Sequence, residues 1–280
     1  MKGNRFYWSV RRELWEHRAV FFGPLAVAAV VLAAVGFNLL RHPEKWRSIA
    51  SLEGPKRVVL MTMPYTLAAS VILLSAFLVG VFYCVDALNA ERRDRSILFW
   101  KSMPVSDTTS VLAKAVVPFA VLPIVAFGVA LAAQFLMLVM TSGTLPTQWQ
   151  ELRLARMTAI MAYGLAVHSL WYAPIYGWLL LVSAWARRAA LMWAVIPLFA
   201  IMIAEHIALG TAWFASALRY RVLGAMTEAY KPNALNTPVT ELEQLEPARF
   251  FANQNLWLGL AFAAACIAGA IYLRRRREPT

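Results

Sequence analysis

The sequence predicts an all-α integral membrane protein with six transmembrane helices. Hydrophobic residues make up 60% of the 280 residues and charged residues only 15%, whereas a soluble domain is about half apolar and about a quarter charged. The apolar residues also fall into blocks long enough for a helix to cross a bilayer, and the charges are confined between these blocks. Disordered, collagen-like and disulfide-rich classes are excluded by the same composition.

The predicted spans form one transmembrane domain over residues 1–280, because no linker or repeat divides the chain. They cover approximately residues 20–40, 60–87, 110–140, 157–184, 189–210 and 255–273. Pro118 and Pro123 are expected to bend the third span rather than end it, since neighbouring helices can satisfy the freed carbonyls. Cys84 and Cys266 lie within apolar blocks, which predicts buried thiols rather than a disulfide or a metal site.

Lysine and arginine set the predicted orientation. If the N-terminus is inside, 16 of the 27 basic residues fall in inner segments and 11 in outer segments. The positive-inside rule therefore predicts that both termini are cytoplasmic. The formal net charge of +12 is expected to meet anionic lipid headgroups rather than nucleic acid.

Residues 4–18 have the pattern of an interfacial helix that precedes the first span. Phe6, Val10 and Leu14 share one helical face, whereas Arg5 lies on another. A helix with an apolar face and a basic face is expected to lie in the plane of the lipid headgroups. A basic segment that only orients the first span is the alternative, and the two are compatible.

The loop between spans two and three is the most informative segment. Residues 91–107 have the sequence ERRDRSILFWKSMPVSD, in which Glu91 and Arg95 are spaced for an ion pair on one helical face. Pro104 ends this helix, and Ser106 can cap the next one. The pattern predicts a short helix, first charged and then apolar, on the cytoplasmic side.

Three apolar residues of this short helix, Leu98, Phe99 and Trp100, would be poorly placed in water. They require either a lipid surface or a pocket in a partner protein. An interfacial helix that simply rests on lipid is the alternative to a docking helix.

Together with the six spans, the interfacial helix and Lys114 at the start of span three, this loop resembles the membrane subunits of ABC-2-type ABC transporters. The resemblance is to bacterial permeases made separately from their ATPase, and its distinctive sequence is confined to residues 91–114. It implies an elbow helix over residues 4–18 and a coupling helix over residues 91–104. It also implies an outer loop over residues 211–254 that is partly re-entrant.

The resemblance further implies partners, a location and site residues. The partners are an ABC ATPase subunit that binds ATP and magnesium, a second permease copy in a homodimer, and membrane lipids. The chain has no G-x-x-x-x-G-K-[ST] phosphate-binding loop of its own, so neither enzymatic activity nor a bound cofactor is expected in it. The location is the bacterial cytoplasmic (inner) membrane. The residues implied in ATPase coupling are Glu91, Arg92, Arg95, Leu98, Phe99, Trp100 and Pro104.

The fourth span contains the predicted substrate path. His168, Trp171, Tyr172 and Tyr176 recur at helical spacing in the middle of the span rather than in an interfacial belt. Their aromatic and weakly polar groups suit an amphipathic substrate. Helix packing, with the hydroxyl groups and the imidazole hydrogen-bonded between helices, is the alternative.

Glu205 and His206 lie toward the outer end of the fifth span and are predicted to form an outer gate. Ionisable residues within a span are functional candidates because burying them is costly. The alternative is an ion pair between Glu205 and Arg219 or Arg221 at the end of the helix.

Three functions remain open from the sequence. The first is the permease subunit of an ATP-driven exporter. The second is an integral membrane enzyme that acts on lipids, which requires a cluster of Asp, Glu or His at one membrane face that the sequence does not suggest. The third is an assembly factor without transport, which the absence of an ATPase partner would favour.

The six-span topology predicts where fused reporters appear. A reporter fused after Arg277 should be cytoplasmic, and one inserted near Asn236 should face outward, because one predicted span separates the two positions. Paired fusions to an export-dependent phosphatase and a cytoplasm-dependent fluorescent protein measure the side. The opposite labelling pattern would contradict this topology.

Overall fold

The computed structural model describes residues 2–93, 105–142, 154–231, 239 and 241–276. In this part of the chain the regular elements are helices, and extended backbone pairs at the single isolated bridge between Tyr230 and Leu245. The described chain is therefore all-α, as the sequence predicts.

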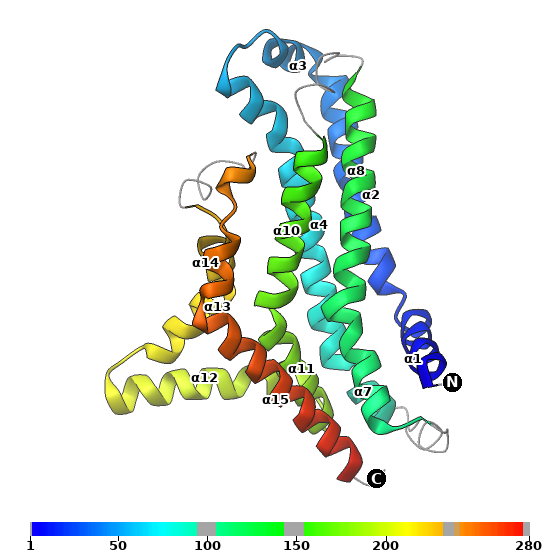
Figure 1. Cartoon of the computed structure of the whole chain (residues 1–280), viewed down its shortest axis with the longest axis vertical. Helices are drawn as coiled ribbons and strands as arrows, with labels where there is room; N and C mark the ends of the chain where they lie inside the picture. Colours follow the sequence, from blue (N-terminus) through cyan, green and yellow to red (C-terminus); the bar gives the residue numbers. More distant parts are fainter. Residues whose placement is uncertain (1, 94–104, 143–153, 232–238, 240, 277–280) are drawn as a thin grey trace.

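Four upright helices run side by side along the long axis of the molecule (Figure 1). They are α2 (Ala19–Arg41), α4 (Pro55–Asp86), α8 (Leu122–Ser142) and α10 (Leu154–Trp171). The bundle continues downward through α11 (Ala173–Trp185) and α15 (Gln254–Arg276), which pack closely together. Both termini lie at this lower end, which we call the terminal end (Figure 1).

Shorter helices surround the bundle. At the terminal end lie α1 (Lys2–Glu16), α5 (Asn89–Arg93) and α7 (Asp107–Val116), and α3 (Pro43–Ala50) covers the opposite end (Figure 1). The remaining elements are α12 (Ala190–Leu209), α13 (Trp213–Ala229), the 3-10 turn η3 (Leu242–Gln244) and α14 (Pro247–Ala252). The predicted outer loop over residues 211–254 is thus largely helical where it is described.

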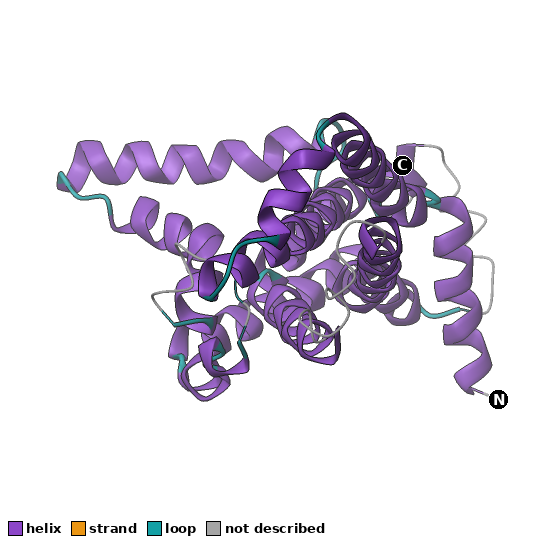
Figure 2. Ribbon diagram, turned by 90° about the horizontal axis from the view of Figure 1, so that it is seen from above, coloured by secondary structure: helices purple, strands orange, loops and turns teal. Residues whose placement is uncertain are grey.

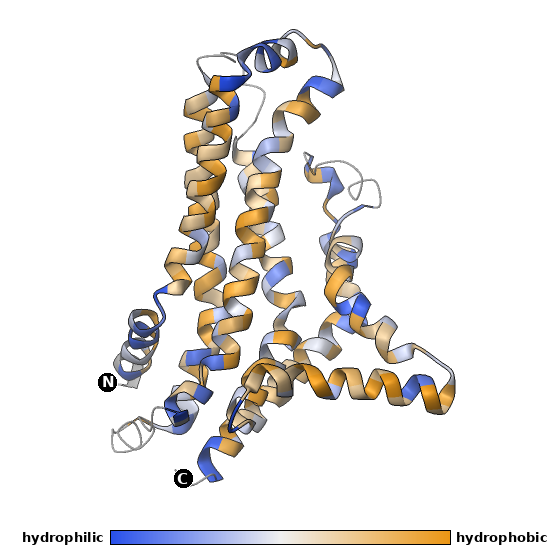
Figure 3. Ribbon diagram, turned by 180° about the vertical axis from the view of Figure 1, so that it is seen from behind, coloured by the Kyte–Doolittle hydropathy of each residue, from blue (hydrophilic) through white to orange (hydrophobic). Residues whose placement is uncertain are grey.

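The chain is a multi-pass membrane protein by the length and composition of its helices. Among the described residues, five helical segments are long and apolar enough to cross a bilayer, and the bent pair α10–α11 is a sixth candidate. Apolar residues cover the upright helices, and polar residues gather toward the two ends of the bundle (Figure 3).

The predicted span over residues 157–184 consists of two helices in the structure. It is broken at Tyr172, where α10 and α11 meet at an angle of 43°. Pro174 causes the break, because it has no N–H to continue the hydrogen-bond ladder and its ring excludes the preceding turn. In span three, Pro118 and Pro123 have the milder effect that the sequence predicts, a π turn at Val117–Val121 between α7 and α8.

The helix at the position of span five lies across the bundle. Figures 1 and 2 both show α12 extending crosswise, away from the upright helices. Only 11% of the apolar stretch of α12 is buried within the chain. The corresponding share is 39% for the segments that contain α4 and α8. Hydropathy predicts the length of an apolar helix and not its direction, so this arrangement could not be predicted from composition.

Small residues allow α11 and α15 to approach closely. An added Cβ at Gly177 would lie 2.9 Å from the Cα atom of Ala263 and 3.1 Å from its carbonyl oxygen. Backbone cannot move aside as a flexible side chain can. Close packing of small residues is the principal means by which helices associate in lipid.

The substitution Gly177→Ala should therefore destabilise the fold by about 1–3 kcal/mol, since it forces the two helices apart. Gly128→Ala is the matched control, because an added Cβ at Gly128 meets no atom within 4 Å. Thermal unfolding of both variants in detergent micelles measures the difference. Equal stability of the two variants would contradict the close contact.

Candidate functional site

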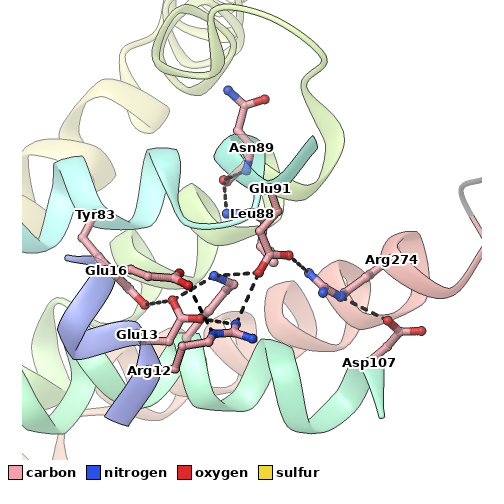
Figure 4. Close-up of polar contacts among 11 residues, drawn as sticks. Arg12, Glu13, Glu16, Tyr83, Leu88, Asn89, Glu91, Asp107 and Arg274 are labelled. Atoms are coloured by element: carbon pink, nitrogen blue, oxygen red, sulfur yellow. Dashed lines mark hydrogen bonds and ion pairs between the residues drawn. The ribbon is translucent and has the colours of Figure 1, made fainter. Parts of the chain in front are cut away.

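A buried cluster of charges joins four helices at the terminal end of the bundle (Figure 4). Its central side chains are Glu13 of α1, Glu91 of α5, Lys114 of α7 and Arg274 of α15, and all four are buried. Glu13 and Lys114 are 0% and 1% exposed. Charges this deeply buried are costly unless they are paired, so the contacts among them determine whether the helices can sit together.

The Lys114 ammonium lies between two carboxylates. Its Nζ is 2.8 Å from Oε2 of Glu13 and 3.1 Å from Oε1 of Glu91. The second oxygen of Glu91 accepts a hydrogen bond of 2.6 Å from Nη1 of Arg274, and Nε of Arg274 donates to Oδ1 of Asp107 at 3.1 Å. These contacts form one continuous chain of alternating charge from α1 to α15 (Figure 4).

Two further residues complete the surroundings of Glu13. Arg12 donates from Nη2 to Oε1 of Glu13 at 2.7 Å, and the Tyr83 hydroxyl donates to Oε2 at 3.3 Å. Burial would raise the pKa of Glu13, but the ion pairs and hydrogen bonds with Lys114 and Arg12 outweigh it and hold the pKa below its ordinary value. The carboxylate therefore stabilises the fold above the ordinary pKa of a glutamate, and this stabilisation is lost as the pH falls through the lowered one.

Local sequence explains how these side chains are positioned. Ser106 caps α7, with its Oγ accepting from the backbone N–H of Thr109 at 3.1 Å, as its position in the sequence predicts. Asp107 and Lys114 are seven residues apart on α7 and so lie on the same face, two turns from each other. Ser183 of α11 accepts hydrogen bonds of 3.0 Å from the backbone N–H groups of both Leu88 and Asn89, which fixes the turn before Glu91.

The charge cluster holds both borders of residues 94–104. Glu91 precedes this segment and Asp107 follows it, and both pair with the single guanidinium of Arg274. The segment itself lies outside the described residues. So do five of the residues predicted to couple to an ATPase, namely Arg95, Leu98, Phe99, Trp100 and Pro104, together with the side chain of Arg92.

The residues of the predicted substrate path lie at the break between α10 and α11. Trp171 and Tyr176 are fully buried. Trp171 donates to the carbonyl of Arg221 at 2.8 Å, and Nε2 of His168 lies 3.3 Å from the Tyr176 hydroxyl. Tyr172, which is only partly buried, donates to the carbonyl of Val222 at 3.0 Å. These contacts favour the packing alternative for Trp171 and Tyr176.

Arg221 of α13 stabilises the break, a role that the sequence did not suggest. Its guanidinium lies over the Trp171 ring at 4.7 Å and donates to the carbonyls of Trp171 at 3.4 Å and Asn255 at 2.6 Å. Carbonyls freed by a helix break in lipid need such donors. The available signal for the break was Pro174, which follows Trp171 by three residues within a predicted span.

Glu205 caps the next helix instead of pairing with an arginine. Its carboxylate accepts hydrogen bonds from the backbone N–H groups of Trp213 at 2.6 Å and Phe214 at 2.8 Å, at the start of α13. A carboxylate at a helix N-terminus satisfies free N–H groups and is favoured by the helix dipole. The ion pair with Arg219 or Arg221 is therefore corrected, and the neighbouring His206 is exposed.

The structure also brings together three residues that the sequence did not connect with a site. Ligand atoms of Glu13, Glu16 and His17 lie within 4.8 Å of one another. Glu13 already has Lys114 and Arg12 as partners, so a divalent cation would have to displace two bound positive charges. This donor set does not suit a metal ion.

Comparisons with protein-family models, with curated proteins and with solved structures found no match. The function of the chain is therefore inferred from its residues and their geometry.

The substitution Lys114→Met should destabilise the protein by about 3–5 kcal/mol, because it leaves two buried carboxylates without their shared cation. Lys45→Met on the exposed surface of α3 is the matched control and should change stability by less than about 0.5 kcal/mol. Thermal unfolding in micelles measures both. Adding Glu13→Gln to Lys114→Met should restore part of the loss, and equal stability of the Lys114 and Lys45 variants would contradict the buried pairing.

Proposed function

We propose that this chain is the membrane-spanning permease subunit of an ATP-driven ABC exporter of the ABC-2 type. In this proposal the chain crosses the bacterial cytoplasmic membrane six times with both termini inside, and it works as one of two copies. The fifth crossing requires α12 to turn from its crosswise course toward the direction of the upright helices. A separate ATPase subunit binds ATP and magnesium and hydrolyses ATP. Residues 91–104 form the coupling helix that docks on that ATPase.

The proposal depends mainly on the way both borders of residues 94–104 are anchored. Glu91 and Asp107 are held by Arg274 of α15, and Glu91 also contacts Lys114, whose second partner is Glu13 of α1. A segment that receives force from a partner protein needs rigid attachment to the helices it moves. Buried ion pairs provide it, because separating them exposes uncompensated charge to an apolar interior.

Two other features support the same function. First, α1 lies crosswise beside the foot of α2, the position expected of an elbow helix (Figures 1 and 2). Second, the apolar run Leu98, Phe99 and Trp100 falls within the anchored segment. An apolar run bracketed by fixed charges suits a docking helix better than a free surface loop.

The geometry gives little support to the alternative of a lipid-modifying enzyme. It requires an acidic or histidine group that can exchange protons with a substrate. The acidic groups gathered at the terminal end instead pair with Arg12, Lys114 and Arg274. An assembly factor without transport is tested by the binding experiment that follows.

The double substitution Phe99→Ala with Trp100→Ala should weaken binding of the ATPase subunit more than tenfold. Truncating one buried aromatic anchor commonly costs about 2 kcal/mol, and about 1.4 kcal/mol is a tenfold change. A pull-down of the detergent-solubilised permease with titrated ATPase measures the affinity.

The matched control is Phe251→Ala with Trp257→Ala. These residues are exposed and lie near the start of α15, so Trp257 is roughly 25 Å along that helix from Arg274. The control should bind the ATPase like the unmodified chain. Undiminished binding by the Phe99 and Trp100 variant would overturn the coupling assignment, and no binding by the unmodified chain would favour an assembly factor.

A further inference from the structure

The outward face of α1 carries an arginine held between two tryptophans. The Arg11 guanidinium carbon lies 5.0 Å from the ring centroid of Trp8 and 4.7 Å from that of Trp15. Positions 8, 11 and 15 are spaced by three and four residues, so the three side chains share one helical face. Trp8 and Trp15 are 49% and 63% exposed.

This face points away from the charge cluster. Glu13 lies on the opposite side of α1 and is buried against Lys114. The Trp8–Arg11–Trp15 face is consequently not needed to hold α1 to the bundle. Within the described part of the chain Arg11 has no ion pair with a carboxylate, and its side chain is partly exposed between the two rings.

The position of α1 determines how deep the Trp8–Arg11–Trp15 face lies in the membrane. Only His17 and Arg18 separate α1 from α2, an apolar candidate span that begins at Ala19. Because α1 lies crosswise to α2, its length runs along the plane in which the apolar run starts (Figure 2). That plane is the boundary between hydrocarbon and headgroups, where tryptophan rings are enriched.

We propose that Trp8, Arg11 and Trp15 form a binding site for the phosphate group of an anionic phospholipid. A guanidinium presents planar, paired donors that match phosphate oxygens, and stacking between two rings fixes its orientation in advance. The indole rings bury their apolar parts beside the acyl chains. The net charge of +12 over the chain favours an anionic lipid over a zwitterionic one.

This site would act on the charge cluster through α1 itself. Arg12 and Glu13 follow Arg11 directly, and they pair with each other and with Glu91 and Lys114. A lipid that holds the outward face therefore restrains the helix whose inward face anchors residues 94–104. The inference concerns lipid binding alone and does not depend on the proposed ATPase partner.

The test uses the full chain in nanodiscs that contain a photoactivatable phosphatidylglycerol or the corresponding phosphatidylcholine. After irradiation, mass spectrometry of the digested protein measures the label on residues 5–18. The unmodified chain should be labelled there preferentially by phosphatidylglycerol. Arg11→Gln should reduce this label about fivefold, the effect of one basic residue near an anionic surface.

Two further variants serve as controls. Arg11→Lys should lose part of the label, because the charge remains but the paired donors and the ring stacking of the guanidinium do not. Arg47→Gln on α3, at the opposite end of the bundle, should leave the label on residues 5–18 unchanged. Equal labelling by both lipids, or undiminished labelling of Arg11→Gln, would overturn the proposal. Unchanged labelling together with loss of ATPase binding in Arg11→Gln would assign this face to a protein partner instead, and would also overturn it.

Discussion

The ammonium group of Lys114 is the constraint on which the terminal end of the molecule depends. It is buried with two carboxylates from different helices, and a lone charge in such a place would be prohibitively unstable. Three helices, α1, α5 and α7, must therefore meet at this point, and α15 joins them through Arg274. Moving one of these helices along another would separate the buried charges and leave them unpaired in the interior. The charge cluster thus sets the register of the helices, and the apolar contacts above it follow.

A second polar contact, between Arg221 and the broken span, also ties helices together, because a polar group in the interior needs a partner. The chain interrupts a helix at Tyr172 and supplies a guanidinium from α13 to the carbonyl of Trp171. Because α10 and α13 share this contact, they are tied together on one side of the break, while α11 packs against α15 on the other. These are two of the polar contacts that join helices in the described part of the chain, and small residues such as Ala126 and Ala130 lie in the apolar core of the bundle.

Much of the helix layout could be predicted from the sequence, but the charge cluster could not. Apolar runs predict helices close to the observed α2, α4, α8 and α15, and the position of Ser106 before α7 predicts its cap. Glu13 and Lys114 are 101 residues apart, and no local pattern shows that they meet. The available signal was Lys114 itself, a lysine within the apolar stretch of span three that needs a buried partner. The crosswise course of α12 was beyond prediction, since hydropathy carries no direction.

Within the charge cluster, Glu91 contacts more cations than the other carboxylates do. Its oxygens lie near three cations from three helices, at 2.6 Å from Arg274, 3.1 Å from Lys114 and 3.5 Å from Arg12. Asp107, by contrast, shares a cation that Glu91 already neutralises. A displacement of Glu91 would disturb α1, α7 and α15 together, whereas a displacement of Asp107 would affect α7 and α15 alone. A displacement at the border that precedes residues 94–104 would therefore reach α1, whereas a displacement at Asp107 would not.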